Sequence, residues 1–312
     1  MNSLTYLGLD ISKLTRELSP HPGLRRRAFP NDPPGHRALL TVLRRLGGPV
    51  QILCEATGGY EHHRLQTRHR AAIPVTLLNP RRVRDYARAS GRLAKTDRLA
   101  AAVLADYGRA FTPAPTPPLG PVQQRLQSLV TRRPELLQLL GQEQLRAEHP
   151  HDPFVIRQAR RLVRTRQQHL VQLEAELAAL PHAAPTLDAQ VQRLSAIQGV
   201  GQRTAWLLLA ALPELGTLGR GQAAALAGLA PYNPDSGPQR GPRHIAHGRA
   251  LARTALSRAA LVAARHNPVL KGVSQRLRTA GKPAKVALVA LMRRLVELAN
   301  LLLKSSSLNL VQ

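Results

Sequence analysis

The stretch Leu4-Thr-Tyr-Leu-Gly-Leu-Asp10 is a short apolar run that ends on a carboxylate. Apolar runs of this length, bounded by polar residues, are typical of buried strands. Two more such runs follow, Val50–Cys54 before Glu55 and Ile73–Leu78 before Asn79-Pro80. Helical patterns over 36–46 and 60–70 indicate that strands alternate with helices. The sequence therefore predicts an α/β domain with parallel strand pairing, which we place at residues 1–111.

Asp10 and Glu55 directly follow two of these predicted strands. Because ligands gather at the strand ends of open α/β sheets, we expect the two carboxylates to lie side by side. Carboxylates that close repel each other unless a cation lies between them. A third acid, Asp97, opens an amphipathic helix, and an all-oxygen set of this kind suits Mg²⁺. Two alternatives stay open: Asp10 and Glu55 could simply end strands at the surface, and Asp97 could cap its helix.

The composition is strongly basic. The chain has 45 Lys and Arg against 18 Asp and Glu, a formal net charge of +27 and an isoelectric point near 11.8. This charge favours a polyanionic partner, for which nucleic acid is the default and an anionic membrane surface the second possibility. No apolar run approaches the ~20 residues of a membrane-spanning helix, and the first ten residues do not resemble a secretory signal. We expect a cytoplasmic protein that acts on DNA without contacting a membrane.

The single cysteine, Cys54, excludes an internal disulfide and a Cys-rich zinc site. It ends an apolar strand, which favours a buried, inert thiol. Aromatic residues make up only 3% of the chain, which argues against recognition of single strands by base stacking.

A proline-rich segment, Thr112–Pro121, divides the chain. Its five prolines in ten residues exclude a helix, so we expect a semi-rigid, extended linker over 112–121. Two long helical patterns follow, Val122–Leu145 and Phe154–Leu180, and they predict an antiparallel helical hairpin or coiled-coil arm over 122–185. The arginines between 157 and 166 could form a solvated face or a face that contacts phosphate or RNA.

We place a helical domain at residues 186–304, followed by a tail at 305–312. An apolar helix, the turn Gly199-Val-Gly201 and a second helix have the pattern of a helix-hairpin-helix. Gly199 and Gly201 would allow a tight turn, and the N–H groups that open the second helix could bind a DNA phosphate. Ser236 lies in a Gly- and Pro-rich loop among basic residues, and could be a turn residue or a nucleophile. The candidate nucleic-acid-binding cations are Arg240, Arg243 and Arg249 in this domain and Lys13, Lys95 and Arg98 in the first.

Several motifs in order resemble the DEDD transposases of the "IS one-ten" insertion-sequence family, whose relatives include the Piv-type DNA invertases. They are Gly8–Lys13, Cys54–Tyr60, Asn79–Val83, Gly91–Asp97, Gly199-Val-Gly201, Leu229-Ala-Pro231 and Ser236-Gly237. The resemblance implies a RuvC-like nuclease domain of RNase H fold, Mg²⁺ bound by Asp10, Glu55 and Asp97, and attack by Ser236 on a DNA phosphate to form a phosphoserine intermediate. It also implies a tetramer with composite active sites and, in many members, a structured bridge RNA that pairs with donor and target DNA.

Ala100 departs from the family pattern, in which a fourth acid lies three residues after the third. Asp106 cannot replace it, because nine residues of helix rotate Asp106 to roughly the opposite side from Asp97. A missing carboxylate should weaken one metal position and the clamp that two metals provide. We expect a transposase or recombinase that uses Mg²⁺ and Ser236. The alternatives are a Piv-like site-specific invertase and a catalytically silent nucleic-acid-binding protein.

Overall fold

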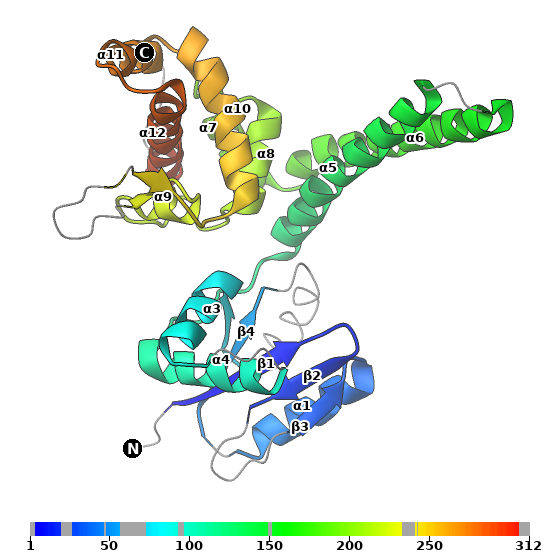
Figure 1. Ribbon diagram of the computed structural model, residues 1–312, viewed down its shortest axis with the longest axis vertical. Coiled ribbons are helices and arrows are strands. Elements are labelled where there is room, and N and C mark those ends of the chain that lie inside the picture. Colours follow the sequence, from blue (N-terminus) through cyan, green and yellow to red (C-terminus); the bar gives the residue numbers. More distant parts are fainter. Residues whose placement is uncertain are drawn as a thin grey trace. The chain divides into compact units, whose positions relative to one another are not determined.

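The structure is a computed structural model that describes residues 4–19, 27–46, 48–56, 73–92, 97–148, 152–232, 241 and 243–305, without the side chains of 97–99. The chain forms two compact units, Met1–Pro118 and Leu119–Gln312, and Figure 1 shows the elements of each. The first unit is α/β and the second is built almost entirely of helices, which confirms the predicted fold class at this level. The helix predicted over 60–70 lies outside the described residues.

A five-stranded mixed sheet of order β3-β2-β1-β4-β5 forms the centre of the first unit. The strands are β1 (Thr5–Ile11), β2 (Thr15–Leu18), β3 (Arg27–Pro30), β4 (Val50–Glu55) and β5 (Val75–Leu78). Strands β1, β4 and β5 are parallel, as the three apolar runs predict. Strands β2 and β3 extend the sheet in antiparallel pairing, and they were not among the predicted strands.

Helices cover both faces of this sheet (Figure 1). Side chains alternate along a strand, so Leu7 and Leu9 face α1 (Pro33–Arg44) while Gly8 faces α4 (Asp97–Phe111). A third helix, α3 (Pro80–Ala89), packs beside α4 over Leu53 and Leu78 of the sheet. Cys54 is a free, buried thiol within the α1-facing cluster. Each face of the sheet therefore has its own apolar core.

The first half of the proline-rich segment is bound to the edge of the sheet. The N–H of Thr116 donates to the carbonyl of Val75 at 2.8 Å, and its hydroxyl accepts from the N–H of Leu77 at 2.9 Å. The buried Gln51 amide donates to the carbonyl of Pro113 at 2.6 Å. The outer edge of β5 is thus covered by residues 113–116, and the boundary between the two units falls after Pro118.

The second unit begins with two long helices, α5 (Pro121–Glu148) and α6 (Pro153–His182), which pack against each other as an antiparallel hairpin (Figure 1). Arg133 of α5 pairs with Glu174 of α6 at 2.7 Å, and Arg125 pairs with Glu176. Asp152 caps α6 by accepting a hydrogen bond from the N–H of Phe154. This hairpin agrees with the predicted arm.

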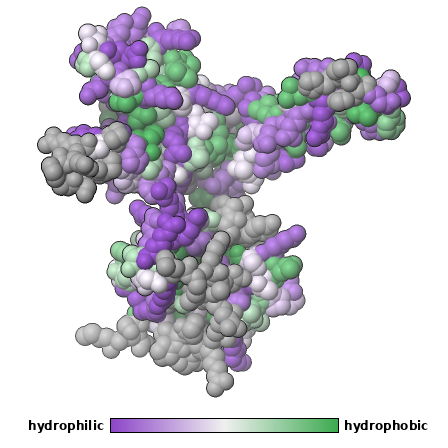
Figure 2. Space-filling model, viewed as in Figure 1, coloured by the Kyte–Doolittle hydropathy of each residue, from purple (hydrophilic) through white to green (hydrophobic). Residues whose placement is uncertain are grey.

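The remaining elements of this unit surround one large apolar core. They are α7 (Pro185–Ser195), α8 (Gln202–Ala211), α9 (Gln222–Leu226), β6 (Pro231–Tyr232), β7 (His244–Ile245), α10 (Ala250–His266), α11 (Pro268–Thr279) and α12 (Ala284–Lys304). Figure 2 shows hydrophilic residues over much of the visible surface. Within the part of the chain that the structure describes, no helix is long and apolar enough to cross a membrane.

Candidate active site and nucleic-acid-binding surface

Asp10 and Glu55 lie at the same level of two neighbouring parallel strands. Strand β1 pairs with β4 through Gly8 and Leu53, with a constant offset of 45 residues along the ladder. The same offset relates Asp10 to Glu55, two positions beyond that last pair. Because side chains alternate along strands, both acids leave the sheet on the face of Gly8 and Leu53. The structure thus brings these two half-buried side chains to one edge of the sheet, the edge formed by the carboxyl ends of the parallel strands.

Helix α4 brings position 97 to the same edge. Ala101 lies so close to Gly8 that a Cβ on Gly8 would come within 1.8 Å of the Ala101 carbonyl oxygen. Two turns later, a Cβ on Gly108 would lie 2.8 Å from the Cβ of Tyr6. The helix therefore crosses β1 in the antiparallel direction, and its N-terminus points toward the carboxyl end of the strand. Helical periodicity puts position 97 on the same stripe as 101 and 108, whereas the Asp97 side chain lies outside the described atoms.

Position 100, at which the sequence departs from the family pattern, lies close to position 97 on α4. Ala100 is half-buried near the start of α4 and carries no polar group. Asp106, further along the helix, forms ion pairs with Arg92 and Arg109. Asp106 thus links the α3–α4 connection to α4, a structural role that is separate from the strand ends.

The donor chemistry of this edge fits a hard divalent cation. Asp10, Glu55 and Asp97 offer only carboxylate oxygens, the ligands that Mg²⁺ prefers. Among the side chains that the structure describes, no three His, Cys, Asp or Glu residues are drawn together closely enough to hold a metal ion. Asp97 is not among these residues, because its side chain is not described.

A further carboxylate lies on the strand that flanks β1 on its other side. The register of β1 and β2 places Glu17 directly opposite Asp10. Directly opposed residues of an antiparallel pair share one face, with about 4.5–5.5 Å between their Cβ atoms. Glu17 was not predicted as a site residue because β2 contains no apolar run that would mark it as a strand. The hairpin does have a local signal, since the hydroxyl of Ser12 accepts a hydrogen bond from the N–H of Thr15 and closes the turn.

The predicted nucleic-acid-binding cations of the first unit are only partly described. Lys13 is exposed in the turn between β1 and β2. Lys95 and the side chain of Arg98 lie outside the described atoms, as do Ser236 and Arg240 in the second unit.

The turn between α7 and α8 holds the two predicted glycines, in different roles. Gly199 has a φ of 103°, and a Cβ there would lie 2.7 Å from the Cβ of Ala263 on α10. Gly201 is the N-cap of α8 at a φ of −81°, with no atom within 4 Å of a Cβ and no side-chain hydrogen bond to the helix start. Gly199 is therefore required for packing, whereas Gly201 leaves the first N–H groups of α8 without a side-chain cap.

Arg249 is committed to a bidentate ion pair within the fold. Its two Nη atoms each donate to one carboxylate oxygen of Glu214 at 2.6 Å, and Nη1 also donates to the carbonyl of Ala211 at 2.9 Å. Burial raises the pKa of Glu214, but the hydrogen bond and charge of Arg249, with a backbone hydrogen bond, outweigh burial and leave this pKa below its ordinary value of 4.5. Arg249 thus joins the end of α8 to the start of α10.

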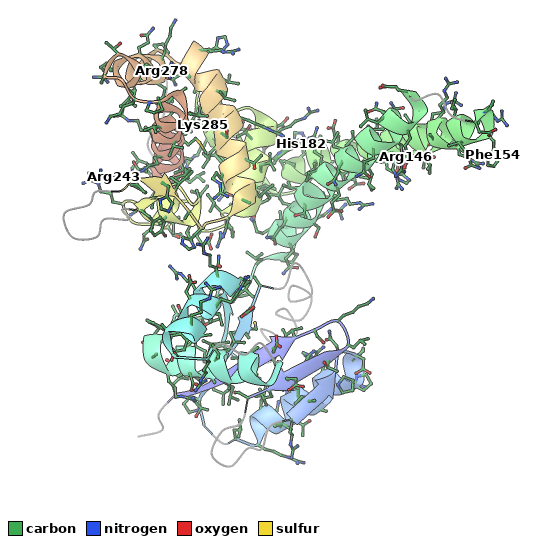
Figure 3. All side chains as sticks on the ribbon, viewed as in Figure 1. Arg146, Phe154, His182, Arg243, Arg278 and Lys285 are labelled. Carbon is green, nitrogen blue, oxygen red and sulfur yellow. The ribbon has the colours of Figure 1, made fainter. Side chains whose placement is uncertain are left out.

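The C-terminal helices carry a large excess of positive charge. Residues 215–296 contain 14 Lys and Arg and a single acid, Asp235. Arg243 is exposed next to β7, and Figure 3 labels it together with Arg278 of α11 and Lys285 of α12, which are also exposed. Such a surface attracts a polyanion over long distances.

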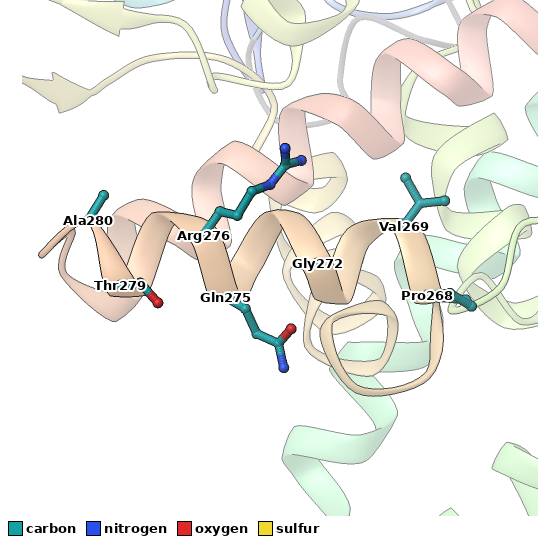
Figure 4. A pocket seen from close by; sticks show the side chains of 7 residues that line it. All are labelled: Pro268, Val269, Gly272, Gln275, Arg276, Thr279 and Ala280. Carbon is teal, nitrogen blue, oxygen red and sulfur yellow. The ribbon is translucent and has the colours of Figure 1, made fainter.

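Two surface depressions of the described residues lie away from the predicted site residues. One of about 770 Å³ runs along α11 and is lined by Val269, Gln275 and Arg276 among others (Figure 4). Another of about 590 Å³ lies at the end of the helical hairpin, beside Glu143 and Arg146. Neither contains a predicted site residue, so the candidate site rests on strand register and helix placement.

Comparison with known proteins agrees with these features. Residues 7–149 match a family model described as "Transposase", and residues 191–275 match one described as "Transposase IS116/IS110/IS902 family". The chain is 25% identical over 310 residues to a "Pilin gene-inverting protein" of Moraxella bovis, and equally to that of Moraxella lacunata. Each alignment covers 95% of both chains. The chain therefore belongs to the IS116/IS110/IS902 family of transposases, enzymes that move and recombine DNA.

Proposed function

We propose that this chain is a transposase that cuts and rejoins DNA for insertion-sequence mobility, with a RuvC-like nuclease unit of RNase H fold. Asp10, Glu55 and Asp97 would hold Mg²⁺. The observation that carries this proposal is the shared level of Asp10 and Glu55 at the ends of β1 and β4, with α4 beginning at the same edge. The mixed sheet, in which β1, β4 and β5 are parallel, supports the assignment of this fold.

The proposed chemistry uses the serine of the second unit. The hydroxyl of Ser236 would give up its proton, form a bond to the DNA phosphorus and release one sugar oxygen, which takes up a proton. The resulting phosphoserine would be resolved when another DNA hydroxyl displaces the serine, so that strands are cut and rejoined without loss of a phosphodiester bond. Mg²⁺ would supply charge stabilisation at the phosphoryl oxygens when bound.

The remaining residues would position nucleic acid. The α7–α8 turn would act as a helix-hairpin-helix, with phosphate bound at the start of α8, and Arg243 with its exposed neighbours would contact DNA or a structured guide RNA. The net charge of +27 supports such a partner. Base pairing by the guide RNA would supply sequence specificity, and a tetramer would complete the active sites from two subunits.

A site-specific DNA invertase is the second candidate. The observation that favours it is the similarity to two pilin gene-inverting proteins over 95% of each chain. The two activities share the same cleavage and joining chemistry, and they differ in their products: an invertase reverses a DNA segment in place, whereas a transposase removes a segment or inserts it elsewhere. A plasmid assay that scores inversion and excision of the same flanking DNA separates them.

A catalytically silent copy is the third candidate, because Ala100 stands where the family has its fourth acid. We would assay strand exchange on the DNA that flanks the gene, with RNA transcribed from that DNA, for wild type, Ala100→Asp and the matched uncharged variant Ala100→Asn. Exchange by wild type supports the proposed enzyme. Exchange only by Ala100→Asp identifies a silent copy, and exchange by none of the three proteins contradicts the proposed function.

A further inference from the structure

We propose that one face of α11 lies in the major groove of duplex DNA, with Gly272 at the point of closest approach. This inference rests on the proposed function, because it takes DNA as the substrate and assigns a surface of the second unit to it. The contact is made by the side of α11 and is separate from the proposed phosphate site at the start of α8.

Gly272 has no structural reason within the described part of the chain. It lies in the interior of α11, where glycine destabilises a helix relative to alanine. It is not among the glycines with a positive φ, and no atom lies within 4 Å of a Cβ built there. Gly272 is therefore required neither for a turn nor for packing. A glycine on an open helix face lets another molecule approach the backbone closely.

The side chains around Gly272 suit the floor of a groove. Figure 4 shows Gln275 and Thr279 on one side of Gly272. Val269 and Arg276 lie on the other side, and Val269 is 71% exposed. Such side chains can donate and accept hydrogen bonds at base edges and can pack on the methyl group of thymine. The surface depression of about 770 Å³ follows this face, so the face is open to a partner.

The opposite face of α11 holds the helix on the fold. Leu270 and Val273 are buried, and α11 packs against α10 and α12. Asn267 caps the helix by accepting from the N–H of Leu270 at 3.0 Å, and its amide donates to the carbonyl of Gln198 at 3.5 Å. Gln198 directly precedes the α7–α8 turn. The start of α11 thus lies next to the turn that carries the proposed phosphate site, and one duplex could contact both.

The cations of α11 form no ion pair within the described residues. Lys271 and Arg278 are seven residues apart, so they share one stripe beside the open face. The sequence has no acidic residue between Asp235 and Glu297. Arginines of the helical hairpin differ in this respect, because several of them pair with glutamates. A polyanion would supply the counter-charges that α11 lacks.

The dimensions of α11 favour B-form DNA as this polyanion. Its 12 residues span about 18 Å, close to the length of five base pairs. The major groove of B-DNA is about 12 Å wide and admits an α-helix, whereas that of double-helical RNA is too narrow and deep for side chains to read. A second copy of this helix is a poor partner, because two basic faces repel each other.

The first test places the same substitution at two open helical glycines of the full-length protein. Gly141 of α5 also has no atom within 4 Å of a built Cβ, so Gly141→Leu is the matched control for Gly272→Leu. Both variants should melt at or above the wild-type temperature, because leucine favours a helix more than glycine does. Fluorescence anisotropy with a duplex from the DNA that flanks the gene measures binding. Gly272→Leu should bind about tenfold more weakly or worse, as for the loss of a good base contact, and Gly141→Leu as wild type.

The second test separates phosphate contacts from the general effect of charge. The double variant Lys271→Gln/Arg278→Gln should lower the slope of log affinity against log salt concentration by about 2, because two phosphate contacts are lost. The control Arg125→Gln/Arg132→Gln removes the same charge from two arginines that pair with glutamates, and it should keep the wild-type slope.

Each contrary result has a distinct meaning. Wild-type duplex binding by Gly272→Leu, or an unchanged slope for Lys271→Gln/Arg278→Gln, overturns the inference and leaves the proposed function standing. The inference is also overturned if Gly272→Leu loses as much affinity for a structured RNA transcribed from the flanking DNA as for the duplex. A melting temperature of Gly272→Leu well below that of Gly141→Leu would reveal an intramolecular contact at position 272 and overturn it too. If the wild-type protein binds no duplex DNA, the proposed function itself fails.

Discussion

Gly8 and Ala101 are in direct backbone contact, and a Cβ on Gly8 would come within 1.8 Å of the Ala101 carbonyl oxygen. This contact sets how closely α4 lies on β1. It therefore also sets where position 97 stands relative to the strand end that carries Asp10. A side chain at Gly8 could be accommodated only by moving the helix, because the nearest atoms that it meets belong to the backbone of Ala101, and the next is the Cβ of Leu104.

Gly8→Ala should destabilise the first unit by about 1–3 kcal/mol or more, the range for overpacking a dense core. The same shift of α4 should weaken Mn²⁺ binding, although residue 8 provides no ligand. Chemical denaturation measures the first effect, and titration of the protein with Mn²⁺ by calorimetry measures the second. Gly48→Ala is the control in the same unit, since no atom lies within 4 Å of a Cβ there. A Gly8→Ala variant as stable as Gly48→Ala would show that the helix is not held in this way.

The two glycines of the α7–α8 turn should respond differently to alanine. Gly199→Ala combines a left-handed φ with a Cβ 2.7 Å from that of Ala263, so the melting temperature should fall by several degrees, as for a loss of roughly 1–3 kcal/mol. Gly201→Ala should fold normally. If the start of α8 binds phosphate, Gly201→Ala should bind DNA more weakly at unchanged stability. Equal melting temperatures for both variants would contradict these separate roles.

The ion pair of Glu214 and Arg249 should make stability depend on pH. The pKa of Glu214 is lowered in the folded protein, so the contribution of the pair is complete above the ordinary pKa of 4.5 and is lost as pH falls through the lower, folded value. The melting-temperature difference between wild type and Glu214→Gln should therefore shrink as pH falls below about 4.5. A difference that stays constant down to roughly pH 3 would contradict this sign.

Arg249→Lys checks the structural role of Arg249 independently of pH. Lysine cannot reproduce the two-pronged contact with Glu214, so we expect a lower melting temperature, while the salt dependence of DNA binding stays as in wild type. A salt dependence of DNA binding that corresponds to about one phosphate contact fewer, with unchanged stability, would instead indicate that Arg249 contacts DNA.

Thr116→Val tests the attachment of the proline-rich segment. Valine has nearly the shape of threonine but cannot accept the hydrogen bond from Leu77, and this leaves that N–H without its side-chain partner. The expected cost is about 1–3 kcal/mol in the stability of the first unit, measured by denaturation. Faster proteolysis within 112–118 should accompany it. Thr112→Val is the control, and equal behaviour of the two variants would contradict the attachment.

Three apolar runs, two of which end on acids, were enough to predict the parallel half of the sheet and to expect Asp10 and Glu55 at the same end of it. Strand β2 was missed because its four residues include Arg16 and Glu17. Arg16 is buried and contacts Asn31 and His36, and no local sequence pattern predicts these contacts. Without that strand, the pairing of Glu17 with Asp10 could not be predicted either. Sequence spacing also could not show that the Asp10 and Glu55 levels coincide, because register depends on packing between distant segments.

Helix α3 and the edge segment were missed for related reasons. The apolar stripe of α3 is short, because it consists of the buried Val83 and the partly buried Tyr86 and Ala87 within ten residues, and so gives only a weak helix signal in the sequence. The prolines of 113–118 predict an extended chain, but they do not predict its attachment to the sheet. Thr116 bonds to β5 through its N–H and hydroxyl, and the carbonyls of Pro113 and Ala114 accept from Gln51 and Thr76. The role of Arg249 depends on Glu214, 35 residues away. In a basic chain, an arginine that holds the fold together has the same local sequence signal as one that binds DNA.

The formation of a covalent protein–DNA adduct tests the proposed reaction most directly. Wild-type protein would be incubated with the flanking DNA, its RNA and Mg²⁺, digested, and examined by mass spectrometry for a nucleotide-bearing peptide. We predict an adduct on Ser236 that is absent from Ser236→Ala and from Asp10→Asn, while both variants still bind the RNA. An adduct that persists in Ser236→Ala, or strand exchange by that variant, would contradict the account.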